Sequence, residues 1–150
     1  MSYFRVGAFA IIFDNRDRVL LCLREDLGIW NLPGGGAERG ESPWEAVVRE
    51  VEEETGLEVE VERLAGVYWR PERAEVNFAF VCRIVSGEIV RTSEAIETRY
   101  FALEEFPKRT SRRHVARIQD ALGSPEETVM KTQLGSSWWE LIEGGSAVDA

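Results

Sequence analysis

The sequence predicts an α/β protein in which a mixed β-sheet lies between α-helices. Apolar runs with the length of strands occur on both sides of one well-marked helix, and a second helix-like segment follows the last run. This alternation is typical of layered α/β architectures. The chain has 150 residues, which suits one domain with a proper core. We expect that domain over residues 1–125, followed by a C-terminal tail over residues 126–150.

The chain begins with two strand-like runs that are separated by a polar turn. Residues 5–13 (RVGAFAIIF) are too apolar to be exposed on both faces, and residues 18–24 (RVLLCLR) follow the turn. We therefore expect these two runs to form a hairpin. Further strands are expected over residues 58–70, 76–85 and 98–103, and a final helix over residues 111–122.

The clearest local pattern predicts a helix over residues 43–55. Ser42 is a suitable N-cap, Glu45 completes a capping box, and Gly56 supplies a C-terminal stop. Pro43 fits the first helical position. The side that we expect to pack on the core contains Trp44, Val47, Val48, Val51 and Thr55.

Three glutamates, Glu50, Glu53 and Glu54, lie together beside this apolar side. Like charges three or four residues apart destabilise an isolated helix by roughly 0.2–0.5 kcal/mol per pair, so a helix built only for stability would avoid them. Clustered carboxylates are the hard oxygen ligands that Mg²⁺ takes in addition to waters and substrate phosphates. A charge run on a helix is more often a solvated surface, and the spacing of the surrounding residues decides between these interpretations.

That spacing resembles the Nudix box at every specified position. From Gly35 the sequence continues through five residues to Glu41, and through seven more to the segment REVEEETGL at residues 49–57. Val51 and Leu57 occupy the two aliphatic places of the motif. The resemblance implies the Nudix fold over roughly residues 3 to 122. It also implies an enzyme that hydrolyses a diphosphate linked to another group.

The resemblance further implies roles for the matching residues. The expected ligands of Mg²⁺, or of Mn²⁺, are Glu50, Glu53, Glu54 and the carbonyl of Gly34. Arg49 and Glu41 are expected to support these ligands, since Arg49 can reach Glu53 one helical turn away.

The general base is left open among Glu53, Glu50 and a further acidic residue. Nudix enzymes often carry an extra glutamate near the strand that corresponds to residues 98–103. Glu94 and Glu97 both precede this strand, and we choose Glu97. The alternative interpretation of Glu97 is a surface acid in a loop.

Aromatic and basic side chains outside the motif are candidates for binding the substrate. They are Arg24, Tyr68, Trp69, Arg70 and Arg73. The aromatic rings could stack on a base and the guanidinium groups could contact phosphate. Only one of Tyr68 and Trp69 is expected to face the site, and Arg24 is as compatible with a local salt bridge as with a phosphate contact.

The position of one proline bears on the choice of substrate. Pro71 lies close to where Nudix enzymes of the ADP-ribose type often carry a proline, so our first choice is ADP-ribose or a nucleotide sugar. Pro71 is also compatible with a simple hairpin turn. A nucleoside triphosphate pyrophosphatase is the alternative enzyme. A non-catalytic module that senses a nucleotide is less favoured, because such modules commonly lose glutamates that this chain keeps.

A second basic group occurs near the start of the final helix. It consists of Arg109, Arg112, Arg113 and His114. The group could hold a polyphosphate tail or offset the acidic surface, and we favour the second interpretation. His114 is a poor candidate for essential catalysis.

Composition limits the classes of partner. A net charge of −9 argues against non-specific binding to nucleic acid or to a membrane surface, but is compatible with a small nucleotide because a bound metal reverses the local field. Cys22 and Cys82 lie in apolar runs and are expected to be buried free thiols of a cytoplasmic protein. We expect no signal peptide and no membrane span. Trp138 and Trp139 in the tail are expected to pack on the domain or on a second subunit, which leaves a homodimer open.

Overall fold

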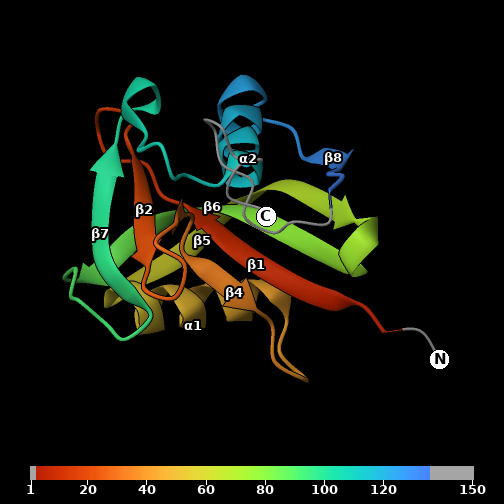
Figure 1. Ribbon diagram of the computed structural model, residues 1–150, viewed down its shortest axis with the longest axis horizontal. Helices are drawn as coiled ribbons and strands as arrows, with labels where there is room; N and C mark the ends of the chain where they lie inside the picture. The colour runs from red at the N-terminus through yellow and green to blue at the C-terminus, as the bar shows by residue number, and fades with distance from the viewer. Residues whose placement is uncertain (1–2, 136–150) are drawn as a thin grey trace.

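The computed structural model describes residues 3–135, which form two β-sheets and two α-helices (Figure 1). In chain order the elements are β1 (Arg5–Ile11), β2 (Val19–Arg24), β3 (Trp30–Asn31), β4 (Gly34–Gly36), α1 (Pro43–Thr55), β5 (Leu57–Arg70), the 3₁₀ turn η1 (Pro71–Arg73), β6 (Glu75–Gly87), β7 (Ala95–Phe101), the 3₁₀ turn η2 (Leu103–Glu105), α2 (Arg112–Gly123) and β8 (Val129–Thr132). The ends of α2 and of strands β5, β6 and β7 differ from the predicted ends by at most three residues.

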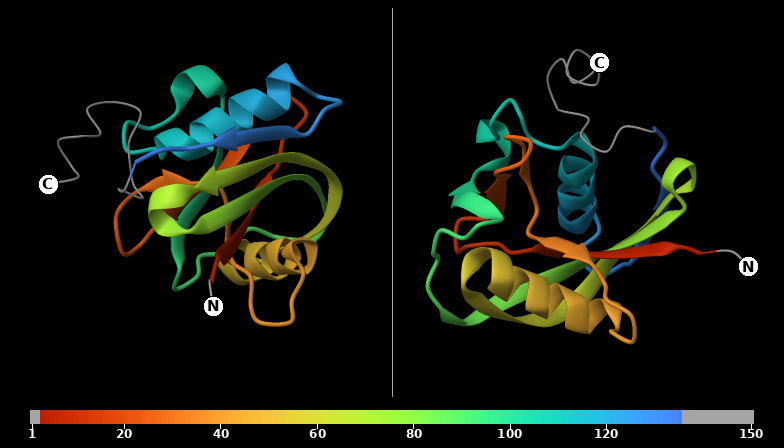
Figure 2. Two further views of the ribbon diagram at one scale, coloured as in Figure 1. Left: turned by 90° about the vertical axis from the view of Figure 1, so that its right-hand side faces the viewer. Right: turned by 60° about the horizontal axis from the view of Figure 1, so that its bottom comes forward.

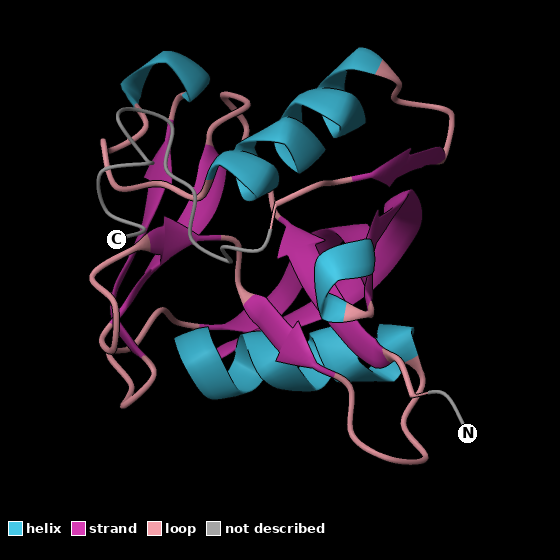
Figure 3. Cartoon of the chain, turned by 45° about the vertical axis from the view of Figure 1, so that its right-hand side comes forward, coloured by secondary structure: helices cyan, strands magenta, loops and turns pink. Residues whose placement is uncertain are grey.

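The larger sheet is mixed and has the strand order β4-β1-β6-β5-β8. Strand β1 is parallel to β6 and antiparallel to β4, while β5 is antiparallel to β6 and parallel to β8. The smaller sheet is antiparallel, with the order β3-β2-β7. Figure 3 shows the strands of both sheets between the two helices.

The two helices cover opposite faces of the larger sheet (Figure 2). One core lies under α1 and contains Val47 and Val51 together with Ala8 and Ala10 of β1. The other core includes Ile118 of α2 and residues such as Ile11, which points to the opposite face because side chains alternate along a strand. The predicted α/β architecture, a mixed sheet between helices, is therefore confirmed.

The expected hairpin of the first two strands is wrong. Strand β1 pairs with β4 and β6, whereas β2 pairs with β3 and β7 in the other sheet. One isolated antiparallel bridge, between Phe13 and Val19, joins the two segments at the turn between them. Strand β1 is apolar along most of its length because it is an interior strand, and its neighbours on both sides leave no free edge for β2.

Helix α1 has the predicted ends and the predicted caps. The Ser42 side chain accepts a hydrogen bond from the backbone of Glu45, the reciprocal bond of the capping box is present, and Gly56 adopts φ 83°. The expected burial of Trp44 is wrong, because its side chain is 60% exposed. The buried side of the helix is turned toward Ala46 and Glu54, since α1 also packs against the glycine strand β4.

The described part of the tail adds an edge strand that the sequence did not predict. Strand β8 pairs with β5 in the register Val67 to Met130, and three of its four residues are exposed. Its polar composition gives no alternation of the kind that marks a half-buried strand. Trp138 and Trp139 lie outside the described residues. None of the described helices is long and apolar enough to cross a membrane.

Candidate active site

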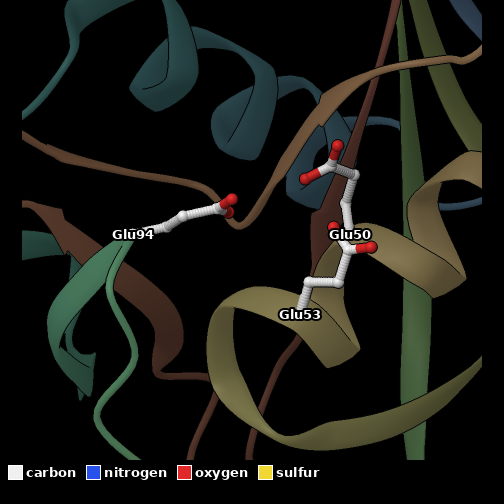
Figure 4. A group of neighbouring side chains, drawn as sticks. All are labelled: Glu50, Glu53 and Glu94. Carbon is white, nitrogen blue, oxygen red and sulfur yellow. The ribbon is translucent and has the colours of Figure 1, made fainter.

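Three carboxylates from two separate elements meet at one end of α1. Glu50 and Glu53 project from the helix, and Glu94 reaches toward them from the segment before β7 (Figure 4). One oxygen of each residue lies within 4.8 Å of the other two. Carboxylate oxygens at this separation are suitable ligands for a divalent cation such as Mg²⁺. The group is called the carboxylate cluster below.

Glu54 lies beside this cluster and is buried, with 8% of its surface exposed. Its carboxylate accepts a hydrogen bond of 3.3 Å from the backbone N–H of Gly34. Burial, and secondarily the negative charge of Glu50, raises the pKa of Glu54. Burial also raises the pKa of Glu50, against the opposing effect of Arg49. The fold therefore holds acidic groups together at an electrostatic cost that a bound cation would relieve.

Arg49 holds several of these acidic side chains in place. Its guanidinium donates two hydrogen bonds to Glu41, of 2.7 and 2.9 Å, and one of 3.1 Å to each of Glu50 and Glu53. It also donates to the carbonyl of Gly36 at 3.2 Å. The hydrogen bonds from Arg49 lower the pKa of Glu41 to about 2. Arg49 thus ties α1 to the loop that precedes it and to β4.

The glycines of β4 make room for the acidic side chains. A Cβ atom on Gly35 would lie 2.8 to 2.9 Å from the carboxylate of Glu50. A Cβ atom on Gly34, which has φ +148°, would lie 2.3 Å from the carbonyl oxygen of Ala8. The contact at Gly34 is with backbone and is too short for any other residue, so the close approach of β4 to β1 requires glycine there. A side chain at position 35 would instead displace the Glu50 carboxylate. The donor set and the space around it both fit a divalent metal.

Glu97, chosen from the sequence over Glu94, lies apart from the carboxylate cluster. It is on β7, paired across the sheet with Leu23, and its carboxylate forms an ion pair of 2.7 Å with Arg99. Glu94, which the sequence left as the alternative to Glu97, is the residue that belongs to the carboxylate cluster. The difference arises because β7 begins at Ala95, which makes Glu97 a strand residue and leaves Glu94 in the loop next to α1.

The predicted substrate-binding aromatics lie outside the cavities near the cluster. Tyr68 is fully buried, and its hydroxyl donates a hydrogen bond of 2.8 Å to Asp120. Trp69 packs edge to face on Phe4, with ring centroids 5.3 Å apart. Both rings therefore make structural contacts in the described chain.

The predicted arginines line cavities. A cavity of about 630 Å³ borders the cluster, and its lining includes Glu50, Glu54, Glu94 and β4. We call it the acidic cavity. A second cavity of about 400 Å³ lies beside α2, and we call it the arginine cavity because six arginines line it: Arg5, Arg24, Arg70, Arg73, Arg113 and Arg117. Both cavities are lined by Phe9, Arg24 and Asn31, so they adjoin.

Arg24 forms the local salt bridge that was one of its two predicted roles, and it also lines both cavities. Its guanidinium forms two hydrogen bonds with Asp26, of 3.1 and 2.7 Å, and the side chain lies in the wall shared by the two cavities. Arg70 and Arg73 reach the arginine cavity because η1, which starts at Pro71, turns the chain between β5 and β6.

Sequence reasoning missed Arg5 of β1 and Arg117 of α2, and it favoured a surface role for Arg113. Arg113 and His114, which we interpreted as part of a surface patch, are buried and line the arginine cavity. Arg117 is the largest fully buried side chain within residues 3–135. A usable signal was present, because His114, Arg117, Ile118 and Ala121 follow the helical spacing of a buried face.

Comparison with known proteins gives consistent results. The family model described as "NUDIX domain" matches residues 3–120. A MutT-like protein of Streptomyces ambofaciens is 38% identical over 118 residues, which cover 78% of this chain and 76% of that protein. An ADP-ribose pyrophosphatase of Methanocaldococcus jannaschii is 38% identical over 104 residues, which cover 65% of this chain and 62% of that protein. The crystal structure of an ADP-ribose pyrophosphatase from Streptococcus suis matches with a TM-score of 0.71 and 28% identity, over 87% of this chain and 100% of that chain.

Proposed function

The chain belongs to the NUDIX family of hydrolases, and from this membership we propose that it hydrolyses a phosphoanhydride bond in a nucleoside diphosphate linked to another group, with ADP-ribose or a nucleotide sugar as the first choice. The observation that carries the proposal is the convergence of Glu50, Glu53 and Glu94 to within 4.8 Å, beside the buried Glu54. Two similar proteins are named as ADP-ribose pyrophosphatases, which supports the choice of substrate.

Divalent metal fits the residues of this site. We propose that Glu50, Glu53 and Glu54 hold Mg²⁺ or Mn²⁺, together with the carbonyl of Gly34. When bound, the metal would neutralise charge on the diphosphate and lower the pKa of a water molecule. Arg49 keeps Glu50 and Glu53 in position through hydrogen bonds of 3.1 Å to each.

Glu94 is our choice for the general base in place of Glu97. It belongs to the carboxylate cluster but comes from a different element than the glutamates of α1, so it can face a water molecule from the other side (Figure 4). A base must lie within hydrogen-bond reach of the proton that it removes, and Glu97 is paired with Arg99 on its own strand. Glu94 would accept the proton as the water attacks phosphorus, and the bridging P–O bond of the anhydride would break so that its oxygen leaves with the other phosphate-bearing product.

A nucleoside triphosphate pyrophosphatase is the second candidate. Its support is the similarity to the Streptomyces ambofaciens protein, which is named as MutT-like. The sensor hypothesis is less favoured, because Glu41, Arg49, Glu50, Glu53 and Glu54 are all present and are brought together.

The deciding experiment measures phosphate release, after coupling to a phosphatase, from ADP-ribose, nucleotide sugars, nucleoside triphosphates and dinucleoside polyphosphates. Each compound is tested with Mg²⁺, with Mn²⁺ and with a chelator. Turnover of one class that the chelator abolishes would identify the substrate. Nucleotide binding without turnover of any compound would favour the sensor.

The substitution Glu53→Gln tests whether the carboxylate cluster is needed for hydrolysis. We expect turnover to fall by about 100-fold or more, because the variant loses a charged oxygen at the carboxylate cluster. Glu52→Gln is the matched control, since Glu52 is its exposed neighbour on α1 and lies outside the cluster. Equal activity of the two variants would contradict the assignment of Glu53.

A further inference from the structure

The arginine cavity concentrates positive charge in a chain that is acidic as a whole. Six arginines line it, while the chain carries a net charge of −9. Two of the six are paired with carboxylates, Arg24 with Asp26 and Arg70 with Glu75, and Glu75 is the one carboxylate among the lining residues. The arginines come from separate parts of the fold, including β1, η1 and α2. Such a concentration is unexpected for a surface that only offsets acidic residues, because the six side chains line one cavity.

A neutral oxygen accepts the hydrogen bonds of Arg117, which lies on α2. Arg117 donates to the Gln133 side chain at 3.0 and 3.2 Å. A neutral acceptor leaves the positive charge of Arg117 in place. Arg117 is 2% exposed, its Nη1 atom has no hydrogen-bond partner in residues 3–135, and its guanidinium lies over the rings of Phe9 and Tyr68 at 5.2 and 5.1 Å.

The burial of the site and the positive charge of the arginines lower the pKa values of His114 and Arg117. Burial, followed by the charges of Arg117, Arg113 and other arginines, holds the pKa of His114 well below its usual value. The ring is therefore neutral, and its Nδ1 atom accepts a hydrogen bond of 2.9 Å from the backbone of Leu32. Burial lowers the pKa of Arg117 to about 9, which still leaves it charged at neutral pH. The cavity thus remains positive without help from histidine.

The arginine cavity also has the right position and size to take part of a substrate. It adjoins the acidic cavity through Phe9, Arg24 and Asn31. Its volume of about 400 Å³ is within the range of small-molecule sites. A substrate with its diphosphate at the carboxylate cluster can therefore extend into it. Guanidinium groups favour phosphate, with which they form paired, charge-assisted hydrogen bonds.

We propose that the arginine cavity binds a phosphate group that the substrate carries beyond the diphosphate that is cleaved. The preferred substrate class is then a nucleotide derivative with an additional phosphate monoester, instead of one that ends in an uncharged sugar or base. This inference rests on the proposed hydrolase function, since it assigns the second half of the same substrate.

The first test measures binding of inorganic tripolyphosphate by isothermal titration calorimetry in the presence of a chelator, so that metal-assisted binding at the glutamates is absent. Arg73→Gln changes an arginine at the cavity that is only partly buried. Arg16→Gln removes the same charge from an exposed turn away from the cavity. We expect roughly tenfold weaker binding for Arg73→Gln, from the loss of a charge-assisted contact, and no change for Arg16→Gln. Absence of binding, or equal weakening by both variants, would overturn the proposal.

The second test compares ADP-ribose with ADP-ribose 2′-phosphate as substrates in Mg²⁺. We expect kcat/KM to be roughly tenfold higher for the phosphorylated compound, mainly through a lower KM, and Arg73→Gln to remove this preference while Arg16→Gln keeps it. Equal kcat/KM for both compounds, with tripolyphosphate inhibiting non-competitively, would mean that the cavity takes a free anion, and would overturn the substrate assignment.

The two proposals fail in different ways. Glu53→Gln should abolish turnover but leave the binding of tripolyphosphate in chelator unchanged. Binding that depends on Arg73, with no turnover of any compound, would overturn the hydrolase proposal and with it the substrate assignment of the cavity. Turnover without binding that depends on Arg73 would overturn the inference about the arginine cavity alone.

Discussion

The guanidinium of Arg49 donates hydrogen bonds to three carboxylates, and the geometry of the proposed metal site depends on it. Glu41 accepts two of its hydrogen bonds, at 2.7 and 2.9 Å, which orients the planar group. The remaining donors then reach Glu50 and Glu53. Since bidentate pairing with a carboxylate requires this planar group, Lys at position 49 would not reproduce the arrangement.

The pairing of Glu41 with Arg49 predicts a specific dependence of stability on pH. The pKa of Glu41 is lowered from 4.5 to about 2 in the folded protein, so the contribution of this carboxylate is complete above pH 4.5 and is lost as the pH falls toward 2. We expect the difference in unfolding free energy between the wild type and Glu41→Gln to shrink over that interval. Urea unfolding at a series of pH values in chelator measures it. Glu52→Gln serves as the control, and a difference that does not vary with pH would contradict the assignment.

The two cysteines provide a second prediction at this scale. Burial is the main cause that raises the pKa of the Cys22 and Cys82 thiols to about 12. At pH 8 only about one thiol in 10,000 would be ionised, and the thiolate is the form that reacts. We expect iodoacetamide to label neither residue in the native protein and both in concentrated urea, as measured by mass spectrometry. Rapid labelling of a protein with a native circular dichroism spectrum would show that the thiols are accessible.

At the scale of elements, β4 and α1 form a unit in which the glycine strand fits against the glutamates. Gly35→Ala would place a methyl group against the Glu50 carboxylate, whereas the nearest atom to a Cβ on Gly36 is 4.0 Å away. Because the Glu50 side chain is flexible at its end, we expect Gly35→Ala to fold and to bind Mn²⁺ about 10 to 100-fold more weakly. Gly36→Ala should bind normally. Calorimetric titration with Mn²⁺ checks both, and equal affinities would show that Glu50 tolerates the displacement.

The features that the sequence predicted correctly depend on residues close together in the chain. The ends of α1 follow from Ser42, Glu45 and Gly56, which act within one or two helical turns. Strand pairing depends on distant partners, and the apolar run of β1 contains no information about whether β2 or β6 lies next to it. Strand β8 was missed for a related reason, since an exposed edge strand needs no apolar alternation.

The candidate site divides in the same way. The glutamates of α1 were identified because one motif contains all of them, whereas Glu94 enters the cluster from a loop whose end is set by the first residue of β7. The arginine cavity combines residues from β1, β2, η1 and α2, and no local pattern brings these together. Helical spacing alone could have predicted the burial of Arg117, because it places this residue on the same face of α2 as Ile118 and Ala121.

At the scale of the whole molecule, two cavities of opposite charge lie side by side. The acidic cavity is suited to a cation and the arginine cavity to an anion. Arg24 and Asn31 line both cavities and lie in the wall that the two share. A substrate with a metal-bound diphosphate and a further phosphate would match both. The fold buries the carboxyl groups of Glu50 and Glu54, and the charge of Glu50 further disfavours the charged form of Glu54. The protein without metal is therefore under electrostatic strain at this site.

This strain predicts how metal binding changes the stability of the whole domain. A cation that binds the folded state alone stabilises it by about 2.7 kcal/mol at 100 times its dissociation constant. For a domain of this size each kcal/mol raises Tm by roughly 2–4 °C, so we expect Mn²⁺ or Mg²⁺ to raise Tm by about 5–10 °C. Glu50→Gln should melt higher than the wild type in chelator, because a carboxylate whose charged form is disfavoured by burial is gone, and should gain little from metal. Differential scanning calorimetry at constant ionic strength, with NaCl as the control salt, measures both effects. An equal gain in Glu50→Gln, or from NaCl alone, would mean that the cation acts on the acidic surface in general instead of at the carboxylate cluster.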